Sequence, residues 1–199
     1  MIEHLRIIVT RIVAVLLIAV VLVSSSALKQ HAPIISNTIF FFGIVLVAVA
    51  TLGRLWCSLY IAGYKTHTLI TKGPYSMCRN PLYFFSMLGA VGVGMTTETV
   101  LVPAFILICF SIYYPLVIKS EEAYLRQLHG AAFSDYFERV PRFFPALSHL
   151  VEPDEYIVKP VVFRKHMSDV IWFIVIVGFL KVNAELHNLG VLPSLFHIY

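Results

Sequence analysis

The segment 67–83 collects polar and aromatic side chains between two long apolar stretches. It reads HTLITKGPYSMCRNPLY, and it contains Arg79 and Asn80 between two tyrosines, Tyr75 and Tyr83. Polar groups without partners are costly in lipid, so this segment must meet protein, water or a polar ligand. It is therefore the first candidate for a site of chemistry.

A second polar segment, 119–145, has two adjacent carboxylates near its start. Ser120 is a favourable N-cap residue, and Glu121 and Glu122 suit the positive end of a helix dipole. Gly130 is suited to end such a helix. The pattern predicts a helix at the membrane interface that begins near Ser120, with another helical turn after Gly130.

Each of these features also has an ordinary structural interpretation. Glu121 and Glu122 could do no more than compensate a helix dipole. Arg79 could be only a positive charge at the cytoplasmic surface, and Tyr75 and Tyr83 only interfacial aromatic residues. Their fixed spacing, together with their expected placement opposite one another, favours a shared site.

The composition places both segments in a membrane protein. Of the 199 residues, 59% are hydrophobic and 13% are charged, and the mean hydropathy is +0.84. In soluble domains charged residues make up about a quarter of the chain. Crossing a bilayer takes about 20 residues of helix, and five apolar blocks are candidates. They run from about Ile7 to Leu28, Ile34 to Leu55, Pro81 to Met95, Val100 to Ile118 and Val170 to Leu189.

We therefore expect an all-α integral membrane protein with about five transmembrane helices in a single domain, residues 1–199. Two N-terminal helices occupy 1–56, a core that contains both polar segments occupies 57–145, and a linker with the last helix occupies 146–199. The first block has the basic start of a signal peptide, but its length and the block that follows favour an uncleaved helix.

The third and fourth blocks are separated only by residues 96–99, so they should form a tight helical hairpin. The two ends of a hairpin lie at the same membrane face. Arg79 and Tyr83 should therefore lie beside Glu121 and Glu122, where the hairpin meets the interfacial helix.

The positive charges predict the orientation of the chain. With a cytoplasmic N-terminus, the loops outside contain only Lys29, whereas the other interhelical Lys and Arg residues face the cytoplasm. This predicts a bacterial inner-membrane protein with both polar segments on the cytoplasmic side and its C-terminus outside. The net charge of +4 follows from this orientation, so we expect no nucleic-acid partner.

The cysteines and histidines give no metal-binding pattern. The three cysteines, Cys57, Cys78 and Cys109, are far apart, and the eight histidines form no His-x-x-His pair. We expect no metal site.

Together the two segments closely resemble the cofactor-binding region of the isoprenylcysteine carboxyl methyltransferase family, integral membrane enzymes similar to phospholipid methyltransferases. The first motif is His67-Thr-Leu-Ile-Thr-x-Gly-x-Tyr75-x-x-x-Arg79-Asn80-Pro81-x-Tyr83. The second runs from Glu121-Glu122 through His129-Gly130 to Pro145 and follows in the family's order. The resemblance covers about residues 50–145.

The resemblance implies a cofactor, S-adenosylmethionine, held by the cytoplasmic segments. Carried over by position, the cofactor-binding residues would be His67, Thr68, Leu69, Ile70, Tyr75, Asn80, Pro81, Leu82, Tyr83 and Glu121. Catalysis would rest on Arg79, Glu121 and Tyr83. Tyr83 would face the sulfonium, Glu121 would accept hydrogen bonds from the cofactor, and Arg79 would pin the loop or pair with the cofactor's carboxylate.

Three positions depart from the family pattern. Asn80 replaces a frequent histidine, and Tyr60 stands where some relatives have glutamine. Val117 occupies the register of an arginine that contacts the substrate carboxylate, which leaves Lys119 as the nearest cation and a candidate substrate-binding residue.

The sequence thus predicts an S-adenosylmethionine-dependent methyltransferase acting on a lipid-like or small amphiphilic acceptor from the membrane. Its reaction would be most like isoprenylcysteine carboxyl O-methylation. A phospholipid-amine or thiol methyltransferase is an alternative. An NADPH-dependent membrane reductase of related fold and a non-catalytic membrane protein are further alternatives. The oligomeric state is left open.

Overall fold

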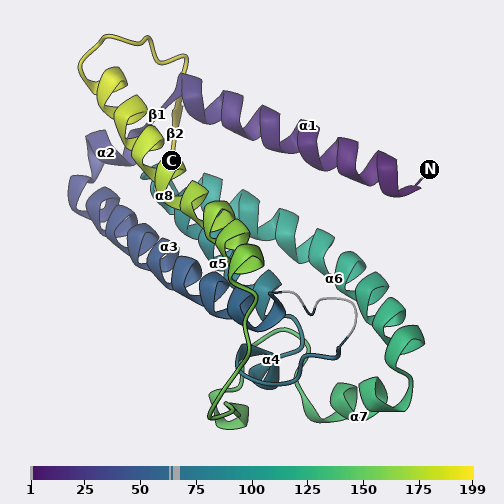
Figure 1. Ribbon diagram of the computed structural model, residues 1–199. Coiled ribbons are helices and arrows are strands. Elements are labelled where there is room, and N and C mark those ends of the chain that lie inside the picture. The colour runs from purple at the N-terminus through teal and green to yellow at the C-terminus, as the bar shows by residue number, and fades with distance from the viewer. Residues whose placement is uncertain (1, 63, 65–67) are drawn as a thin grey trace.

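In the computed structural model, the apolar blocks from residue 34 onward form helices that pack into a bundle, and the helix of the first block diverges from it (Figure 1). The structure describes the backbone of residues 2–62, 64 and 68–199, and side chains from residue 12 onward within these ranges. His67, one of the predicted cofactor-binding residues, lies outside the described residues. The helices in chain order are α1 (Ile2–Val23), α2 (Ala27–His31), α3 (Pro33–Ile61), α4 (Pro74–Met77), α5 (Pro81–Met95), α6 (Leu101–His129), α7 (Ala131–Arg139) and α8 (Pro160–Asn188), with a 3₁₀ turn at Leu147–His149.

Within the described residues, three helices are long and apolar enough to cross a membrane: α3, α6 and α8, each of 29 residues. The other two expected crossings are shorter. They are α5, with 15 residues, and the described apolar part of α1, Ile12–Val23. The all-helical membrane architecture is therefore confirmed at the level of three candidate spans.

The expected hairpin forms between α5 and α6, which pack against each other across a short connection. The predicted helix start at Ser120 is wrong, because α6 continues without interruption through this residue to His129. Residues 121–128 are rich in good helix formers, so no new N-cap is needed. The end at Gly130 is confirmed: this glycine has a φ of +53°, and its N–H donates to the Arg126 carbonyl at 3.0 Å. The predicted extra turn is α7.

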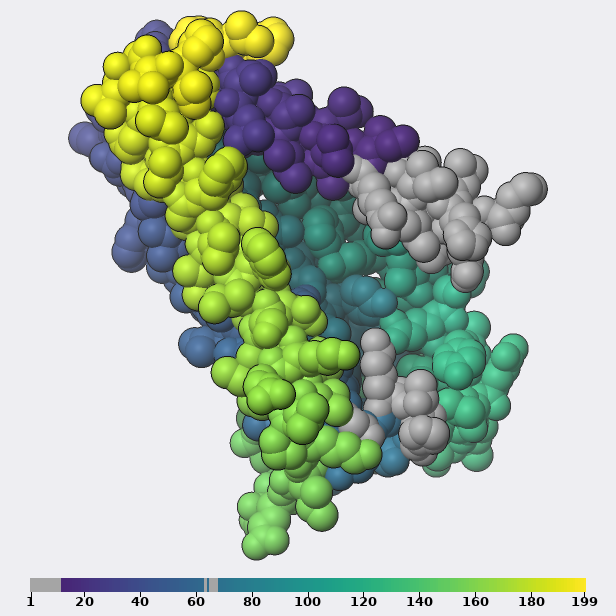
Figure 2. Space-filling model, turned by 45° about the horizontal axis from the view of Figure 1, so that its top comes forward, coloured from purple at the N-terminus to yellow at the C-terminus, as the bar shows by residue number. Residues whose placement is uncertain are grey.

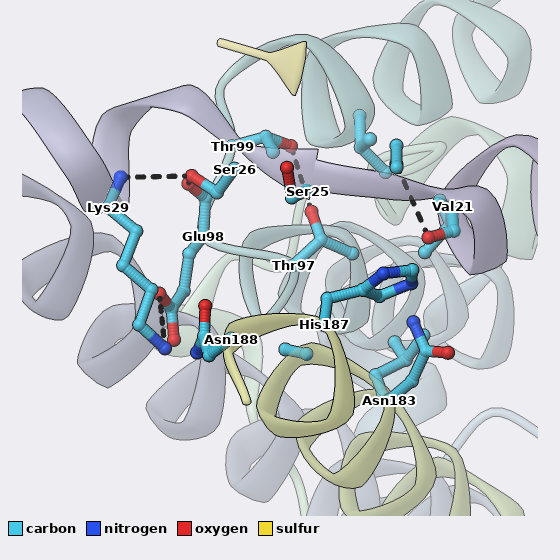
Figure 3. Close-up of a pocket in the computed structure, with 14 residues that line it drawn as sticks. Val21, Ser25, Ser26, Lys29, Thr97, Glu98, Thr99, Asn183, His187 and Asn188 are labelled. Atoms are coloured by element: carbon cyan, nitrogen blue, oxygen red, sulfur yellow. Dashed lines mark hydrogen bonds and ion pairs between the residues drawn. The ribbon is translucent and has the colours of Figure 1, made fainter. Parts of the chain in front are cut away.

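The end of the bundle remote from α4 and α7 is closed by a buried ion cluster around Glu98 (Figure 3). Ser36 Oγ donates to Glu98 Oε2 at 2.9 Å. Lys29 Nζ lies 3.5 Å from the same oxygen, and Lys181 Nζ lies 3.2 Å from Oε1. Lys181 also pairs with Glu185 at 3.2 Å. The cluster ties α2, α3 and α8 to the turn of the hairpin.

The same end holds a two-stranded parallel sheet of β1 (Ser24–Ser26) and β2 (Phe196–Ile198), which joins the C-terminal residues to the end of α1. The Leu101 N–H donates to the Tyr199 carbonyl at 2.9 Å, so the last residue is fixed to the start of α6. The cavity beside Glu98 measures only about 40 Å³, room for little more than a water molecule. This end therefore has a structural role: it holds the C-terminal residues against the end of α1 and the start of α6.

Close packing of α3 against α5 depends on glycines. A Cβ atom added at Gly92 of α5 would lie 2.8 Å from the Gly43 carbonyl oxygen of α3. A Cβ added at Gly53 would lie 2.3 Å from the ring of Phe85. These glycines let the two helices approach backbone to backbone.

We expect Gly92→Ala to destabilise the protein by about 1–3 kcal/mol, because the added methyl group meets backbone that cannot move aside. Gly178→Ala is the matched control, since a Cβ at that position of α8 has no neighbour within 4 Å. It should be neutral or stabilising by up to about 1 kcal/mol through helix propensity. Thermal unfolding in detergent measures both. Equal melting temperatures for the two variants would contradict the close α3–α5 contact.

Candidate functional site

A cavity of about 270 Å³ lies between α3, α5 and α6, beneath the segment 68–70. Its lining combines two motifs that are about 40 residues apart in the sequence. The lining residues are Arg54, Ile61, Thr68, Leu69, Ile70, Tyr75, Arg79, Asn80, Leu82, Tyr83, Ser86, Tyr114, Glu121, Leu125 and Tyr136.

One hydrogen bond joins the two halves of the hairpin inside this cavity. The Tyr83 hydroxyl of α5 donates to Glu121 Oε2 of α6 at 2.8 Å. The ring of Tyr83 also meets Tyr114 edge to face, with their centroids 5.0 Å apart. The bond uses one oxygen of Glu121 and leaves Oε1 as an acceptor at the cavity. The arrangement sets a carboxylate among aromatic and aliphatic side chains.

Arg79 is held by protein groups on several sides. Its Nε donates to Glu122 Oε1 at 2.8 Å. Its Nη1 donates to the carbonyls of Phe137 at 2.7 Å and Val140 at 2.6 Å. The guanidinium also lies over the Phe137 ring, 4.0 Å from the centroid. Arg79 therefore fastens the first motif to α6 and α7, although it still contributes to the cavity wall.

Asn80 and Glu122 extend this network to the chain after α7. Asn80 Nδ2 donates to the Arg142 carbonyl at 2.9 Å and lies 3.4 Å from Glu122 Oε1. Arg142 Nε lies 3.3 Å from Glu122 Oε2. Asn80 also precedes Pro81, the first residue of α5. Proline lacks a backbone N–H, but at this position the N–H would have no partner within the helix, so no hydrogen bond is lost. Glu122 thus accepts hydrogen bonds from Arg79 and Asn80 and pairs with Arg142, whereas the neighbouring Glu121 lines the cavity.

Backbone contacts hold the turn 73–78 in place. The Tyr136 hydroxyl donates to the Tyr75 carbonyl at 2.7 Å, and the Ala146 N–H donates to the Met77 carbonyl at 3.0 Å. Gly73 has a φ of +59° and lies so close to Tyr60 that a Cβ would be 2.3 Å from its ring. Only glycine fits here.

Burial keeps the titratable groups of this turn neutral. It raises the pKa of Tyr75 well above its usual value and raises the pKa of the Cys78 thiol to about 12. Both groups therefore stay protonated at cellular pH. Neither is a ready nucleophile or base.

The structure brings together most residues that the sequence singled out. Those that line the cavity are Thr68, Leu69, Ile70, Tyr75, Arg79, Asn80, Leu82, Tyr83 and Glu121. Pro81 starts α5 without lining the cavity. Lys119 faces a different cleft, together with Arg126 and Arg142.

Sequence reasoning missed several lining residues, chiefly Arg54, Ser86 and Tyr114. Each stands within or at the end of an apolar helix, at a position that shows no local motif. The sequence did contain a signal for Arg54, because a charged residue within a membrane helix is costly and commonly marks a functional site.

Among the residues that the structure describes, no group of three or more His, Cys, Asp or Glu side chains could hold a metal ion.

Comparison with known proteins gives one family match, to the phospholipid methyltransferase family over residues 34–132. The nickel-cobalt-cadmium resistance protein NccN of Alcaligenes xylosoxydans xylosoxydans is 42% identical over 70% of this chain and 65% of its own length. The cobalt-zinc-cadmium resistance protein CzcN of Cupriavidus metallidurans is 38% identical over 80% of this chain and 74% of its own. The chain thus spans just under two thirds of the length of NccN.

A plant relative carries the name of an enzyme. Protein-S-isoprenylcysteine O-methyltransferase B of Arabidopsis thaliana is 33% identical over 59% of this chain and 62% of its own length. No solved structure matched the chain.

We expect Arg79→Lys to destabilise the protein by about 1–3 kcal/mol, because one ammonium cannot replace the bonds to Glu122 and to two carbonyls. Arg126→Lys is the matched control: Arg126 is exposed, and its guanidinium carbon lies 4.7 Å from the Phe137 ring centroid. It should change stability by no more than about 0.5 kcal/mol. Thermal unfolding in detergent compares the two, and an unchanged melting temperature for Arg79→Lys would contradict the fastening role.

Proposed function

We propose that this chain, which belongs to the phospholipid methyltransferase family, transfers a methyl group from S-adenosylmethionine to a lipid-like acceptor. The observation that carries the proposal is the Tyr83–Glu121 hydrogen bond at the cavity. It joins the two motifs whose spacing resembles that of membrane methyltransferases. The cavity volume of about 270 Å³ lies near the lower end of small-molecule sites, about 300–1,000 Å³.

The lining groups fit the chemistry of this cofactor. Glu121 Oε1 suits an ammonium or a ribose hydroxyl. The rings of Tyr83 and Tyr114 suit a sulfonium, which aromatic faces attract. Leu69 and Leu82 suit the flat apolar faces of adenine. When bound, the cofactor supplies an electrophilic methyl group.

The chain's own part in the reaction would be alignment and exclusion of water. Methyl transfer gains mainly from holding donor and acceptor in line at short distance. Tyr83 and Glu121 would be the contacting residues, as predicted, together with Thr68, Leu69, Ile70, Tyr75 and Asn80. Arg79 would act as a positioning residue, since its donors are engaged with Glu122 and two carbonyls. His67 remains a candidate contact from the sequence alone.

The acceptor would enter from the bilayer. α6 and α8 both pack on α5, and the surface is hollowed between them in Figure 2. Carboxyl O-methylation of an isoprenylcysteine-like compound, phospholipid-amine methylation and thiol methylation all remain compatible with this cavity. Among the described residues, the lining of the cavity offers no feature that favours a nicotinamide-dependent reductase.

The names of NccN and CzcN refer to metal resistance. We propose that any such link for this chain is indirect, through the methylated product. The site is lined by one carboxylate, two arginines, one side-chain amide, hydroxyl groups and aromatic rings, a set poorly suited to soft or borderline metal ions.

We also propose the five-crossing arrangement, with the cofactor site on the cytoplasmic side. α1 and α5 would then cross alongside α3, α6 and α8, and the Glu98 cluster would lie near the outer surface.

The detergent-purified protein should bind S-adenosylmethionine in calorimetry. Tyr83→Ala and Glu121→Ala should each weaken this binding about tenfold or more, because a charge-assisted hydrogen bond is lost. Tyr124→Ala and Glu138→Gln are matched controls on exposed positions of α6 and α7, and both should bind like wild type. Wild-type protein without affinity for the cofactor, or unaffected binding by both site variants, would refute the proposal.

The orientation is tested by reporter fusions. An alkaline phosphatase fused after Lys159 should be inactive, since that residue should be cytoplasmic, and one fused after Tyr199 should be active. The reverse pattern would overturn the proposed topology without touching the cofactor site.

A further inference from the structure

Arg54 is an arginine of α3 whose charge has no counter-ion among the described residues. Its Nη1 donates to Ser86 Oγ of α5, and its guanidinium carbon lies 5.6 Å from the Phe173 ring centroid of α8. Its Nε is buried without a hydrogen-bond partner. Thr51 Oγ1 is also buried and unpartnered, but Thr51 does not line the cavity.

Keeping the charge of Arg54 within an apolar helix costs desolvation free energy. Arginine remains protonated in proteins, and an intramembrane charge is retained only where it pairs or serves a ligand. A single hydroxyl and one aromatic ring of α8, 5.6 Å from the guanidinium carbon, compensate the charge only poorly. The guanidinium therefore has spare donors, and it lines the candidate cofactor cavity.

Arg54 lies at the membrane side of that cavity. It precedes Ile61, the last residue of α3, by seven positions, or about 10 Å of helix. Tyr114 precedes Glu121 on α6 by the same distance. From these positions along the helices, Arg54, Ser86 and Tyr114 lie at the end of the cavity nearer the middle of the bundle, which we call its floor. Thr68–Ile70 and Tyr136 lie at the opposite end, which we call its mouth.

We propose that Arg54, supported by Ser86, binds an anionic oxygen group of the acceptor, a carboxylate or a phosphate, at the floor of the cavity. The inference rests on the proposed function, which places the cofactor near Glu121 and the mouth. A guanidinium presents paired donors that match both oxyanions. This assigns the acceptor to the class of anionic amphiphiles, and it places substrate recognition on Arg54 instead of Lys119, which faces another cleft.

The test measures binding of three probes to the detergent-purified protein loaded with S-adenosylhomocysteine. The probes are octanoate, octyl phosphate and neutral octanol, and thermal melting reports their apparent affinities. Wild type should bind at least one of the two anions about 10- to 100-fold more tightly than octanol. Which anion is preferred distinguishes a carboxylate acceptor from a phosphate one.

Three variants make the result specific to this residue. Arg54→Gln should lose the preference for the anion, and Arg54→Lys, which keeps the charge, should retain part of it. Arg164→Gln is the matched control, because Arg164 is exposed on α8 and does not line the cavity. Should Arg54→Gln prove unstable, the Arg54→Lys variant alone must still bind the anion more weakly than wild type.

Two outcomes would overturn the inference. One is an equal preference for anions in wild type, Arg54→Gln and Arg54→Lys. The other is that Arg54→Gln abolishes the discrimination between S-adenosylmethionine and its decarboxylated analogue, which would assign Arg54 to the cofactor's carboxylate. Failure of the proposed function is separate: wild type would then bind neither S-adenosylmethionine nor S-adenosylhomocysteine, whatever its affinity for the anions.

Discussion

The buried pair of Arg79 and Glu122 is the interaction on which the site depends. The guanidinium side chain is only 8% exposed, and it contacts the end of α6 and the C-terminal part of α7 together. Since a buried arginine must satisfy several donors at once, this one contact fixes the relative positions of three segments. The cavity is the space that these segments enclose with α3, so its shape follows from the pair.

The hairpin makes such a pair possible, because it returns the chain to the same face of the bundle. The connection between α5 and α6 is held in place by Glu98, which contacts Ser36 and two lysines. One network thus sets the register of α5 against α6 at the far end, and another sets it at the site. Between them, glycine contacts with α3 leave little freedom for α5 to slide.

Much of this arrangement could be predicted from the sequence, for identifiable reasons. The apolar blocks predicted the helices, and the short break at 96–99 predicted the meeting of Tyr83 with Glu121. The helix start at Ser120 was predicted wrongly, because a cap residue followed by acidic residues is also compatible with a continuing helix. Local pattern could not separate the two glutamates either: Glu122 faces Arg79 and Glu121 faces the cavity, which depends on how α6 is rotated. Arg54 and Tyr114 became part of the site only through tertiary packing.

The short length of α5 has a consequence for the membrane around it. Its 15 residues extend about 22 Å, whereas the hydrocarbon layer of a bilayer is about 30 Å thick. Where α5 crosses, lipid must thin locally or the polar ends of the helix must sink below the headgroups. Glu98 and Asn80, both buried at those ends, suit such sunken positions. In the proposed five-crossing arrangement the cavity would lie at the depth of the glycerol and upper acyl region. The proposed amphiphilic acceptor would then react without leaving its leaflet, and bilayer thickness would be a physical variable that tunes its access.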